Sequence, residues 1–238
     1  MKLLGISASL RNLRSGGDSK SLIDELCSIS SREHLTEYIK NQANLSISTF
    51  IRSGRGTSLS FDEIYANLKK DDKRAGLSNS EVLLAVALWK AKSCNMDIEH
   101  ISLSEILGET SKQSTIRDSF LEKINSADGI LISGPVYFGD RGSLTHSLIQ
   151  LLRHENKYVK DKFLAGISVG AKRNGGQETT LIYQMVDFLN IGMLAVGNDA
   201  ETTAQYGGTG HAGDVGTICS DNYGIDTSLG TGNRIAQA

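Results

Sequence analysis

The chain has 238 residues with 25 basic and 27 acidic side chains, which gives a formal net charge of −2 at pH 7. A chain of this length can bury one large core without disulfides. The balanced charge and a pI near 6.2 argue against binding to a nucleic acid, which usually needs a concentrated basic face. The first apolar run is too short for a signal peptide, and no stretch is long enough to span a membrane. We therefore expect a cytoplasmic protein with neither nucleic acid nor a membrane as partner.

Cysteine and histidine are too scattered to predict a metal site. The three cysteines, Cys27, Cys94 and Cys219, form no CxxC pair, and reduced thiols are expected. The five histidines show no ligand spacing such as HExxH. The sequence therefore predicts neither a bound metal nor a cysteine-ligated cluster.

Short apolar runs alternate with helical patterns along the chain. Five runs are expected to be strands: Lys2–Ser7, Ile98–Leu103, Gly129–Ser133, Phe163–Val169 and Met193–Gly197. Four patterns of helical period are expected to be sheet-packing helices: Ser80–Lys92, Ser114–Asn125, Ser143–Arg153 and Gln177–Asn190. This alternation predicts an α/β fold with a doubly wound five-stranded parallel sheet, most simply of the flavodoxin-like order 2-1-3-4-5.

The segment Asn12–Gly76 does not fit this alternation. It contains a breaker run at Ser53–Gly56 and three capped helical patterns, at Leu22–Leu26, His34–Asn41 and Phe61–Lys69. We interpret it as a helical insertion after strand 1 of a single domain, forming a lid or partner-docking cap near the end of that strand. In the alternative interpretation, Ser19 would start the first sheet-packing helix directly.

The end of the chain is rich in glycine. Gly208–Gly213 spells GxGxxG, but no strand leads into it and no helical pattern follows, so a loop is expected. The residues Gly232–Ala238 look like the first turn of a final helix that is cut short. Trp89 lies within an apolar helical pattern and is expected to pack in the core.

Small hydroxyl residues and one arginine stand on both sides of the insertion. Ser7, Ser9 and Arg11 leave the first strand, and Ser78, Asn79 and Ser80 begin the next sheet-packing helix. Hydroxyls, a guanidinium and the N–H groups of a helix N-terminus can all bind one phosphate. The alternative, in which Ser78 or Asn79 only caps the helix, leaves the residues of the first strand unexplained. We therefore predict a monophosphate cradle, and a P-loop is excluded because GxxxxGK[ST] is missing.

The only proline of the chain stands after the third strand. Pro135 fixes its own φ and favours an extended residue before it, so the strand is expected to end there in a rigid loop. Ligands bind at the carboxyl ends of strands in open parallel sheets. The residues expected to surround a flat ring with polar edges are Pro135, Val136, Tyr137, Phe138 and Gly139. The alternative is an ordinary strand-to-helix turn.

A glycine-rich loop follows the fourth strand within Ser168–Thr180. Glycines let the backbone approach a ligand closely. Lys172 and Arg173 could attract the phosphate of a nicotinamide nucleotide, and a solvated basic turn is the alternative. The residues expected to contact the ligand are Gly170, Arg173, Asn174, Gly175 and Gly176.

Together these three loops resemble those of the flavodoxin-like NAD(P)H-dependent FMN reductases and the related iron–sulfur flavoproteins. The similarity covers Met1–Arg11 and Gly76 to the chain end, and its longest motif is SVGxxRNGGQE at Ser168–Glu178. The resemblance implies that the Pro135 loop holds the isoalloxazine. It also implies that the FMN phosphate is bound by the residues of the monophosphate cradle, which are Ser7, Ser9, Arg11, Ser78, Asn79 and Ser80. No side chain then acts as a catalytic acid or base, because the flavin carries the chemistry. The cysteine cluster of the iron–sulfur flavoproteins has no counterpart here, so no cluster is implied.

The same resemblance implies an oxidoreductase that takes hydride from NAD(P)H and reduces a second acceptor, which is a quinone, a free flavin or a protein. It also implies a homo-oligomer. Two alternatives remain open. One is an electron carrier that docks to a redox partner. Carriers of that kind tend to be strongly acidic, so a net charge of −2 disfavours this alternative. The other is a binding or assembly module without enzymatic activity, with the insertion as its partner surface.

Overall fold

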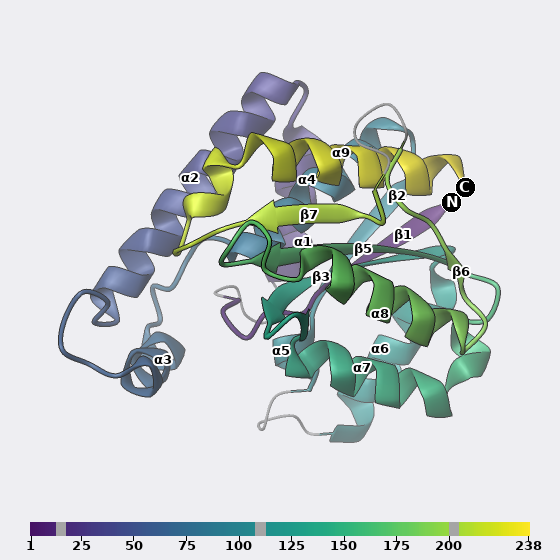
Figure 1. The fold of residues 1–238 in the computed structure, drawn as a ribbon, viewed down its shortest axis with the longest axis horizontal. Coiled ribbons are helices and arrows are strands. Elements are labelled where there is room, and N and C mark those ends of the chain that lie inside the picture. The colour runs from purple at the N-terminus through teal and green to yellow at the C-terminus, as the bar shows by residue number, and fades with distance from the viewer. Residues whose placement is uncertain (13–17, 108–112, 200–204) are drawn as a thin grey trace.

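A computed structural model describes residues 1–12, 18–107, 113–199 and 205–238. Within these ranges, one sheet lies between two layers of helices (Figure 1). The main path of the sheet is parallel, in the order β2-β1-β3-β5-β6. Its strands are β1 (Lys2–Ser7), β2 (Asp97–Ser102), β3 (Gly129–Tyr137), β5 (Phe163–Gly170) and β6 (Leu194–Ala195). This order confirms the predicted flavodoxin-like α/β fold, to which the structure adds two short strands, β4 (Asp140–Arg141) and β7 (Gly208–His211).

The fifth position of the sheet is shared by two short strands. β6 pairs with the start of β5, and β7 pairs with its end, from Ile167 to Gly170. The single strand predicted at Met193–Gly197 is therefore only partly right, and the loop predicted at Gly208–Gly213 is wrong. A Cβ on Gly210 would stand 2.5 Å from the Leu83 side chain, so glycine is needed for the close fit of β7. Glycine disfavours strands locally, but this packing outweighs that preference.

β3 continues through Pro135 to Tyr137, so the expected strand end at Ser133 is wrong. The carbonyl of Ser133 accepts a hydrogen bond from the Ala8 N–H, on the β1 side. Two residues later Pro135 faces the same side, where β1 has already ended. Its missing N–H therefore costs the sheet no hydrogen bond, while the other edge of β3 still pairs with Val169.

Helices cover both faces of the sheet. Figure 1 shows α4 (Asn79–Ser93) and α9 (Asn222–Gln237) above it, and α6 (Gln113–Ser126), α7 (Ser143–His154) and α8 (Gln177–Leu189) below it. Along β1, Leu3 packs in the core beneath α4, whereas Leu4 and Ile6 pack in the core on the opposite face. This alternation is what a strand buried on both faces requires. The ends of the four helices predicted in this part of the chain are confirmed to within one residue.

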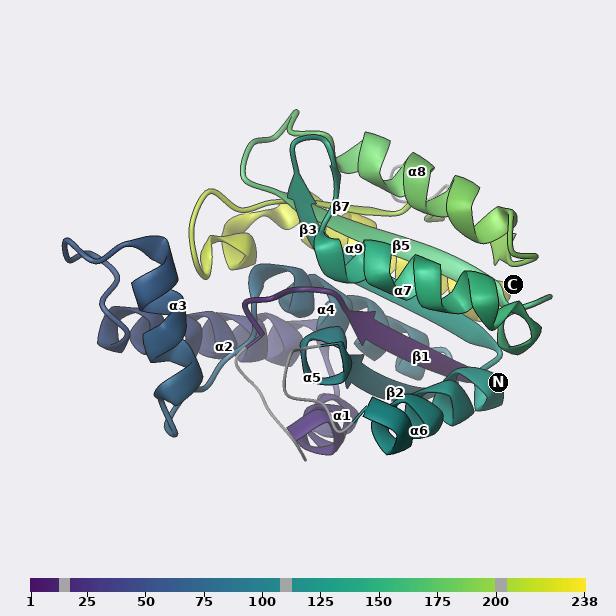
Figure 2. The same ribbon diagram turned by 90° about the horizontal axis from the view of Figure 1, so that it is seen from below.

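The insertion consists of α1 (Asp18–Ser28), α2 (Arg32–Arg52) and α3 (Phe61–Lys70). Residues 13–17 of the predicted insertion lie outside the described residues. Figures 1 and 2 show α2 reaching past the sheet, with α3 packed across its far end. α4 contacts β1, β3 and β5, whereas α1 contacts the edge strand β2 and places Leu22 and Leu26 in the same core as α4. The alternative interpretation, in which a sheet-packing helix starts directly at Ser19, is therefore partly right: α1 begins there and packs at the edge of the sheet, while α4 covers its centre.

The insertion changes the surroundings of α4. Leu35 and Ile39 of α2 join the same core as α4, and every residue from Ser80 to Leu88 is buried. A helix that is buried all round must be covered on every side. Trp89 also packs partly against this core, and its Nε1 donates to the Ile29 carbonyl (3.0 Å), which confirms its expected place.

The chain ends in α9, which the sequence did not predict as a full helix. Of Gly232–Ala238, all residues but Ala238 lie in the last turns of α9 and not in the first turn of a helix, so that interpretation is wrong. A Cβ on Gly232 would overlap the carbonyl of Ala87, because α9 packs tightly on α4. The remaining short helices are α5 (Leu103–Ile106), η1 (Asn156–Tyr158) and η2 (Thr217–Ser220).

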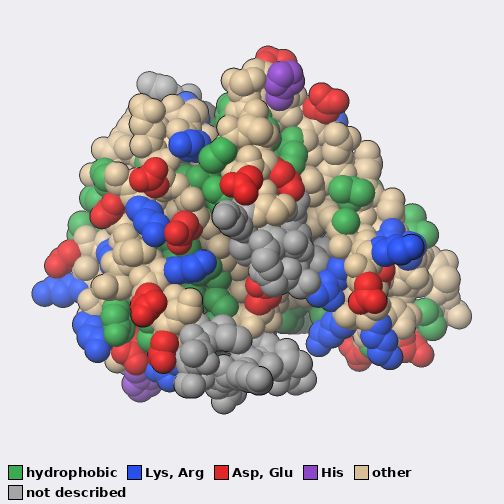
Figure 3. All heavy atoms as spheres, turned by 180° about the vertical axis from the view of Figure 1, so that it is seen from behind, with side chains coloured by type: hydrophobic (Ala, Val, Ile, Leu, Met, Phe, Trp, Pro, Cys, Tyr) green, Lys and Arg blue, Asp and Glu red, His purple; other side chains and the backbone are tan. Residues whose placement is uncertain are grey.

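Charged side chains of both signs are interspersed over the face seen from behind (Figure 3). This distribution agrees with the nearly balanced composition. None of the helices in the described residues is long and apolar enough to cross a membrane.

Candidate functional site

The carboxyl ends of β1 and β3 meet the N-terminus of α4. Ser78 caps this helix: its Oγ accepts from the Glu81 N–H (3.3 Å), and the Glu81 carboxylate accepts from the Ser78 N–H (3.4 Å). Ser133, on β3, donates its hydroxyl to the Ser80 carbonyl (2.7 Å). These bonds fix the first turn of α4 beside the strand ends, and the N–H groups of a first turn have no partner within their helix.

Asn12 links β1, β2 and the N-terminus of α4, although the sequence did not single it out. Its Nδ2 donates to the hydroxyls of Ser7 (2.8 Å) and Ser102 (2.7 Å), and its Oδ1 accepts from Ser78 Oγ (2.9 Å). Ser7 is fully buried and therefore supports the cradle through Asn12. The only sequence signal for Asn12 was its position next to Arg11 after a strand end.

Arg11 is held against the insertion. Its Cζ lies 5.1 Å from the centroid of the Phe61 ring on α3, within the range of a cation–π contact. Its backbone N–H donates to Ser9 Oγ (3.1 Å). The Arg11 Nε is buried without a hydrogen-bond partner in the described residues. A buried donor without a partner favours an anionic ligand at this point.

These groups open onto one pocket, which we call the cradle pocket. It lies where the strand ends, the start of α4 and the insertion meet. Its lining residues are Ser9, Arg11, Ser46, Phe50, Ser78, Asn79, Ser80, Pro135, Val136, Tyr137, Val169, Ala171, Ala212 and Val215. Predicted residues of the phosphate group and of the Pro135 loop thus line the same pocket, together with α2 residues that the sequence did not indicate.

The tip of the Pro135 loop points away from this pocket. β3 and β4 form a hairpin in which Tyr137 pairs with Asp140. The two residues between them, Phe138 and Gly139, have φ values of 54° and 79°. Two consecutive left-handed residues make the tight turn that suits a two-residue hairpin. The Phe138 side chain is fully exposed and does not line the cradle pocket, although it is expected to surround the ring, whereas Tyr137 lines that pocket.

The side chain of Asn79 anchors a neighbouring loop. Its Nδ2 donates to the Asp214 carbonyl (2.8 Å), and its Oδ1 accepts from the Gly216 N–H (3.0 Å). Arg55, between α2 and α3, forms an ion pair with the Asp214 carboxylate (2.5 Å). The hydrogen bond from Arg55 lowers the pKa of Asp214 below its usual value. The insertion, the start of α4 and the loop after β7 are therefore tied together.

Tyr65 of α3 lies beside the cradle and was also missed. Its ring is 5.5 Å from that of Phe61, and its hydroxyl is buried without a hydrogen-bond partner in the described residues. Burial raises the pKa of this hydroxyl; the nearby Tyr137 raises it further, and Arg11 opposes the shift. Tyr65 therefore stays protonated and is a neutral donor next to Arg11.

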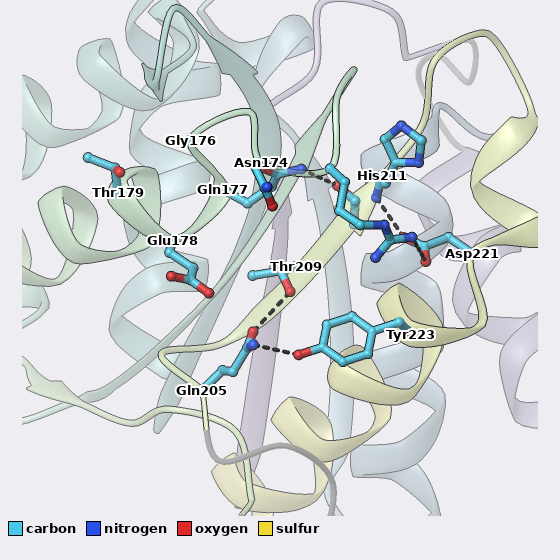
Figure 4. A pocket seen from close by; sticks show the side chains of 12 residues that line it. Asn174, Gly176, Gln177, Glu178, Thr179, Gln205, Thr209, His211, Asp221 and Tyr223 are labelled. Atoms are coloured by element: carbon cyan, nitrogen blue, oxygen red, sulfur yellow. Dashed lines mark hydrogen bonds and ion pairs between the residues drawn. The ribbon is translucent and has the colours of Figure 1, made fainter.

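The glycine-rich loop faces a second pocket at the β7 edge of the sheet, which we call the edge pocket (Figure 4). In this view, Thr209 of β7 lies between Glu178 of α8 and Tyr223 of α9. The pocket is lined by Arg173, Asn174, Gly176, Gln177, Glu178, Thr179, Gln205, Thr209, Gly210, His211, Asp221 and Tyr223. Arg173, Asn174 and Gly176, which are expected to contact the ligand, therefore line a different pocket from the other two loops, and this loop gives the cradle pocket only Ala171.

Gln177 organises this loop and was not predicted. Its Nε2 donates to the carbonyls of Lys172 (2.7 Å) and Gly210 (3.1 Å), and its Oε1 accepts from the Gly175 N–H (2.9 Å). Gly170 and Gly175 line neither pocket; a Cβ on Gly170 would stand 2.7 Å from the Gln177 side chain. Their role in the structure is therefore to support the loop.

Arg173 is anchored inside the edge pocket. Its guanidinium lies 3.3 Å from the buried carboxylate of Asp221, which also accepts from the His211 N–H (2.7 Å). The Arg173 side chain nevertheless keeps more than half of its surface exposed. It can therefore still meet an anion that enters the pocket.

The family model for NADPH-dependent FMN reductases matches residues 64–206, which is more than half of the chain. The chain belongs to this family. An iron–sulfur flavoprotein of Methanocaldococcus jannaschii is 37% identical over 122 residues, which are 50% of this chain and 63% of the relative. An iron–sulfur flavoprotein of Methanosarcina thermophila is 41% identical over 87 residues, which are 35% of this chain and 45% of the relative. The chain thus covers less than two thirds of either relative.

The fold of this FMN reductase family member is also found in a solved flavone reductase. The two superpose with a TM-score of 0.50 at 16% identity, over 100% of this chain and 62% of that chain. The family match includes Ser78–Ser80 and the Pro135 loop but begins within α3. Ser9, Arg11 and the α2 residues of the cradle pocket therefore lie outside it.

The cysteines of this family member lie on separate elements. Cys27 is exposed on α1. Cys94 follows α4 and donates to Asn233 Oδ1 (3.5 Å), and Cys219 lies in η2 and donates to the Gly216 carbonyl (3.0 Å). In the part of the chain that the structure describes, no group of three metal-ligating side chains comes together. The thiols present do not fit the cysteine set of an iron–sulfur cluster.

Proposed function

We propose that this protein is an FMN-dependent oxidoreductase that takes hydride from NAD(P)H and passes electrons to a second acceptor. The observation that carries this proposal is the cradle pocket. It joins Ser9, Arg11 and the N-terminus of α4 to the Pro135 and Tyr137 side chains in one cavity, within a chain of the FMN reductase family.

The residues of the cradle pocket fit FMN. Arg11 Nε is a buried donor that lacks a partner among the described residues, and the first-turn N–H groups of α4 add partial positive charge. Both favour a terminal phosphate. Pro135, Val136 and Tyr137 would flank the flavin ring, with Val169, Ala171 and Val215 keeping water from it. When bound, FMN supplies the redox chemistry, while the protein supplies position and electrostatics.

The side chains of the site would then bind and orient rather than transfer protons. Arg11 neutralises phosphate charge, Ser9 and Ser78 fix the loop and the helix around it, and Tyr137 presents its ring at the pocket wall. Tyr65 remains protonated beside Arg11, because its pKa is raised. No group in this set has a geometry that assigns it to proton transfer.

The reductant and the acceptor are further parts of the proposal. Arg173 in the edge pocket could attract the phosphates of a nicotinamide nucleotide, which the family's description as NADPH-dependent supports. The acceptor would be a quinone, a free flavin or a protein. The cytoplasmic location and the homo-oligomer remain predictions.

Stopped-flow spectroscopy on the purified protein tests this function. The protein should bind FMN with a visible absorption spectrum, and NADH or NADPH should bleach that spectrum at a rate that rises with nucleotide concentration. Bound FMN that neither nucleotide reduces would favour an electron carrier. A protein without any flavin affinity would instead be a binding or assembly module.

A further inference from the structure

The inserted helix α2 places a buried hydroxyl on the wall of the cradle pocket. Ser46 is 1% exposed, and its Oγ has no hydrogen-bond partner in the described residues. It lines the pocket together with Arg11, Ser78 and Ser80. Of the buried, unpartnered polar atoms found in those residues, Arg11 Nε and Ser46 Oγ belong to side chains that line this pocket.

Other hydroxyls on α2 behave differently. Thr36 and Ser48 donate to the carbonyls four residues earlier, those of Arg32 and Asn44, each at 2.9 Å. Such back-bonding is the usual way for a helical serine or threonine to satisfy its hydroxyl. Ser46 does not use it, although it is more deeply buried than Ser48. A buried hydroxyl without a partner is unfavourable unless a ligand satisfies it.

Gly76 fixes α2 against the start of α4. It has a φ of +98°, and a Cβ there would stand 2.6 Å from the Gln42 carbonyl oxygen and 2.8 Å from Ser46 Cα. The chain therefore passes directly over this turn of α2 and reaches the helix cap Ser78 two residues later. Ser46 thus has a fixed position relative to the N-terminus of α4.

We propose that Ser46 is a phosphate ligand supplied by the insertion, which makes the cradle selective for a flavin carrying a phosphate monoester. This inference rests on the proposed FMN site. A phosphate offers several acceptor oxygens, so it can take hydrogen bonds from Ser46 Oγ, from Arg11 Nε and from the first turn of α4 at once. Ser46 lies before residue 64, where the family match begins, so this ligand belongs to the insertion of this chain.

The test compares Ser46→Ala with Ser48→Ala, which removes an exposed hydroxyl from the same helix. Dissociation constants for FMN and for riboflavin are measured by flavin fluorescence, and melting temperatures with and without FMN. Ser46→Ala should weaken FMN binding about tenfold, which corresponds to about 1.4 kcal/mol, and leave riboflavin binding unchanged. Ser48→Ala should change neither.

The ligand-free melting temperature separates a binding role from a structural one. A methyl group in place of an unpartnered hydroxyl should leave this temperature unchanged or raise it, while FMN should stabilise Ser46→Ala less than the parent. Equal effects on FMN and riboflavin, or unchanged FMN binding, would overturn the role of Ser46 and leave the proposed function standing. A parent protein that binds no flavin would overturn both.

Discussion

Gly176, at the start of α8, lies directly against Gly139 at the tip of the β3–β4 hairpin. A Cβ on Gly176 would overlap the Cα of Gly139. Both residues have left-handed backbone, with φ values of 99° and 79°, where glycine is favoured. This contact joins the loop of the edge pocket to the hairpin that carries Tyr137. The loop that lines the edge pocket and the hairpin that carries a residue of the cradle pocket therefore touch at this pair of glycines.

Replacing Gly176 by Ala should destabilise the protein by more than the roughly 1–2 kcal/mol that left-handed backbone costs a residue with a side chain. The added methyl must also push the hairpin away. Gly56→Ala is the matched control, because Gly56 has a φ of +88° but no heavy atom within 4 Å of its added Cβ. Urea unfolding of both variants measures the difference. Equal losses in the free energy of unfolding of the two variants would mean that the hairpin moves away from the added methyl at no measurable cost.

Arg11→Ala should weaken FMN binding by roughly ten- to a hundredfold, the range expected when a charged hydrogen bond worth about 1.5–3 kcal/mol is lost. Riboflavin binding should change far less, because it lacks the phosphate. Arg74→Ala is the control: Arg74 donates to the Lys69 carbonyl (3.0 Å) and does not line the cradle pocket. Fluorescence titrations give the constants. Equal losses for both flavins would refute the phosphate assignment.

Tyr137→Ala and Phe138→Ala should behave differently although the residues are neighbours. Tyr137 lines the cradle pocket, so its loss should shift the spectrum of the bound flavin and slow its reduction. Phe138 is fully exposed at the hairpin tip, and its loss should leave both unchanged. Absorption spectra and stopped-flow traces test the pair. A spectral change only in Phe138→Ala would place the flavin on the other side of the hairpin.

The ion pair between Arg55 and Asp214 should make stability depend on pH in the acidic range. The Arg55 hydrogen bond lowers the pKa of Asp214 from its usual value of 3.8 in the folded state, so the unfolded chain binds the proton more readily. The stabilisation is complete above the usual value and is lost as the pH falls through the lowered one. The urea midpoint should therefore drop less on acidification in Asp214→Asn than in the parent. An identical drop in both would show that the pair contributes nothing measurable.

The elements around the sheet could be predicted because each is encoded locally. The apolar runs of β1 and β5 and the helical period of α8 set those elements without reference to the rest of the chain. The long helix α9 could not be predicted in this way, since Gly224, Gly230 and Gly232 each disfavour a helix by about 1 kcal/mol. Close packing on α4 and β7, seen at Gly232 and Gly224, outweighs that preference.

The candidate site was only partly predictable for a related reason. Ser9, Arg11 and Tyr137 follow strand ends, and any parallel sheet brings such ends together. Ser46 instead reaches the cradle pocket through the contact of α2 with Gly76, which no local pattern indicates. The sequence also does not indicate that the site divides into two pockets, because this division depends on how β7 pairs with β5 and on the hydrogen bonds of Gln177.

The insertion should contribute to the stability of the whole domain, since α2 shares its core with α4. Leu35 and Ile39 are 1% exposed in that core, whereas Leu45 on the same helix is 45% exposed. Leu35→Ala or Ile39→Ala should lower the free energy of unfolding by about 2–5 kcal/mol, the usual cost of truncating a buried aliphatic side chain. Leu45→Ala should cost under about 0.5 kcal/mol, as most surface substitutions do. Urea unfolding followed by Trp89 fluorescence reports on α4, where Trp89 lies. If Leu35→Ala left the unfolding of Trp89 unchanged, the insertion would be a passive addition, and the fixed position of Ser46 beside α4 would lose its support.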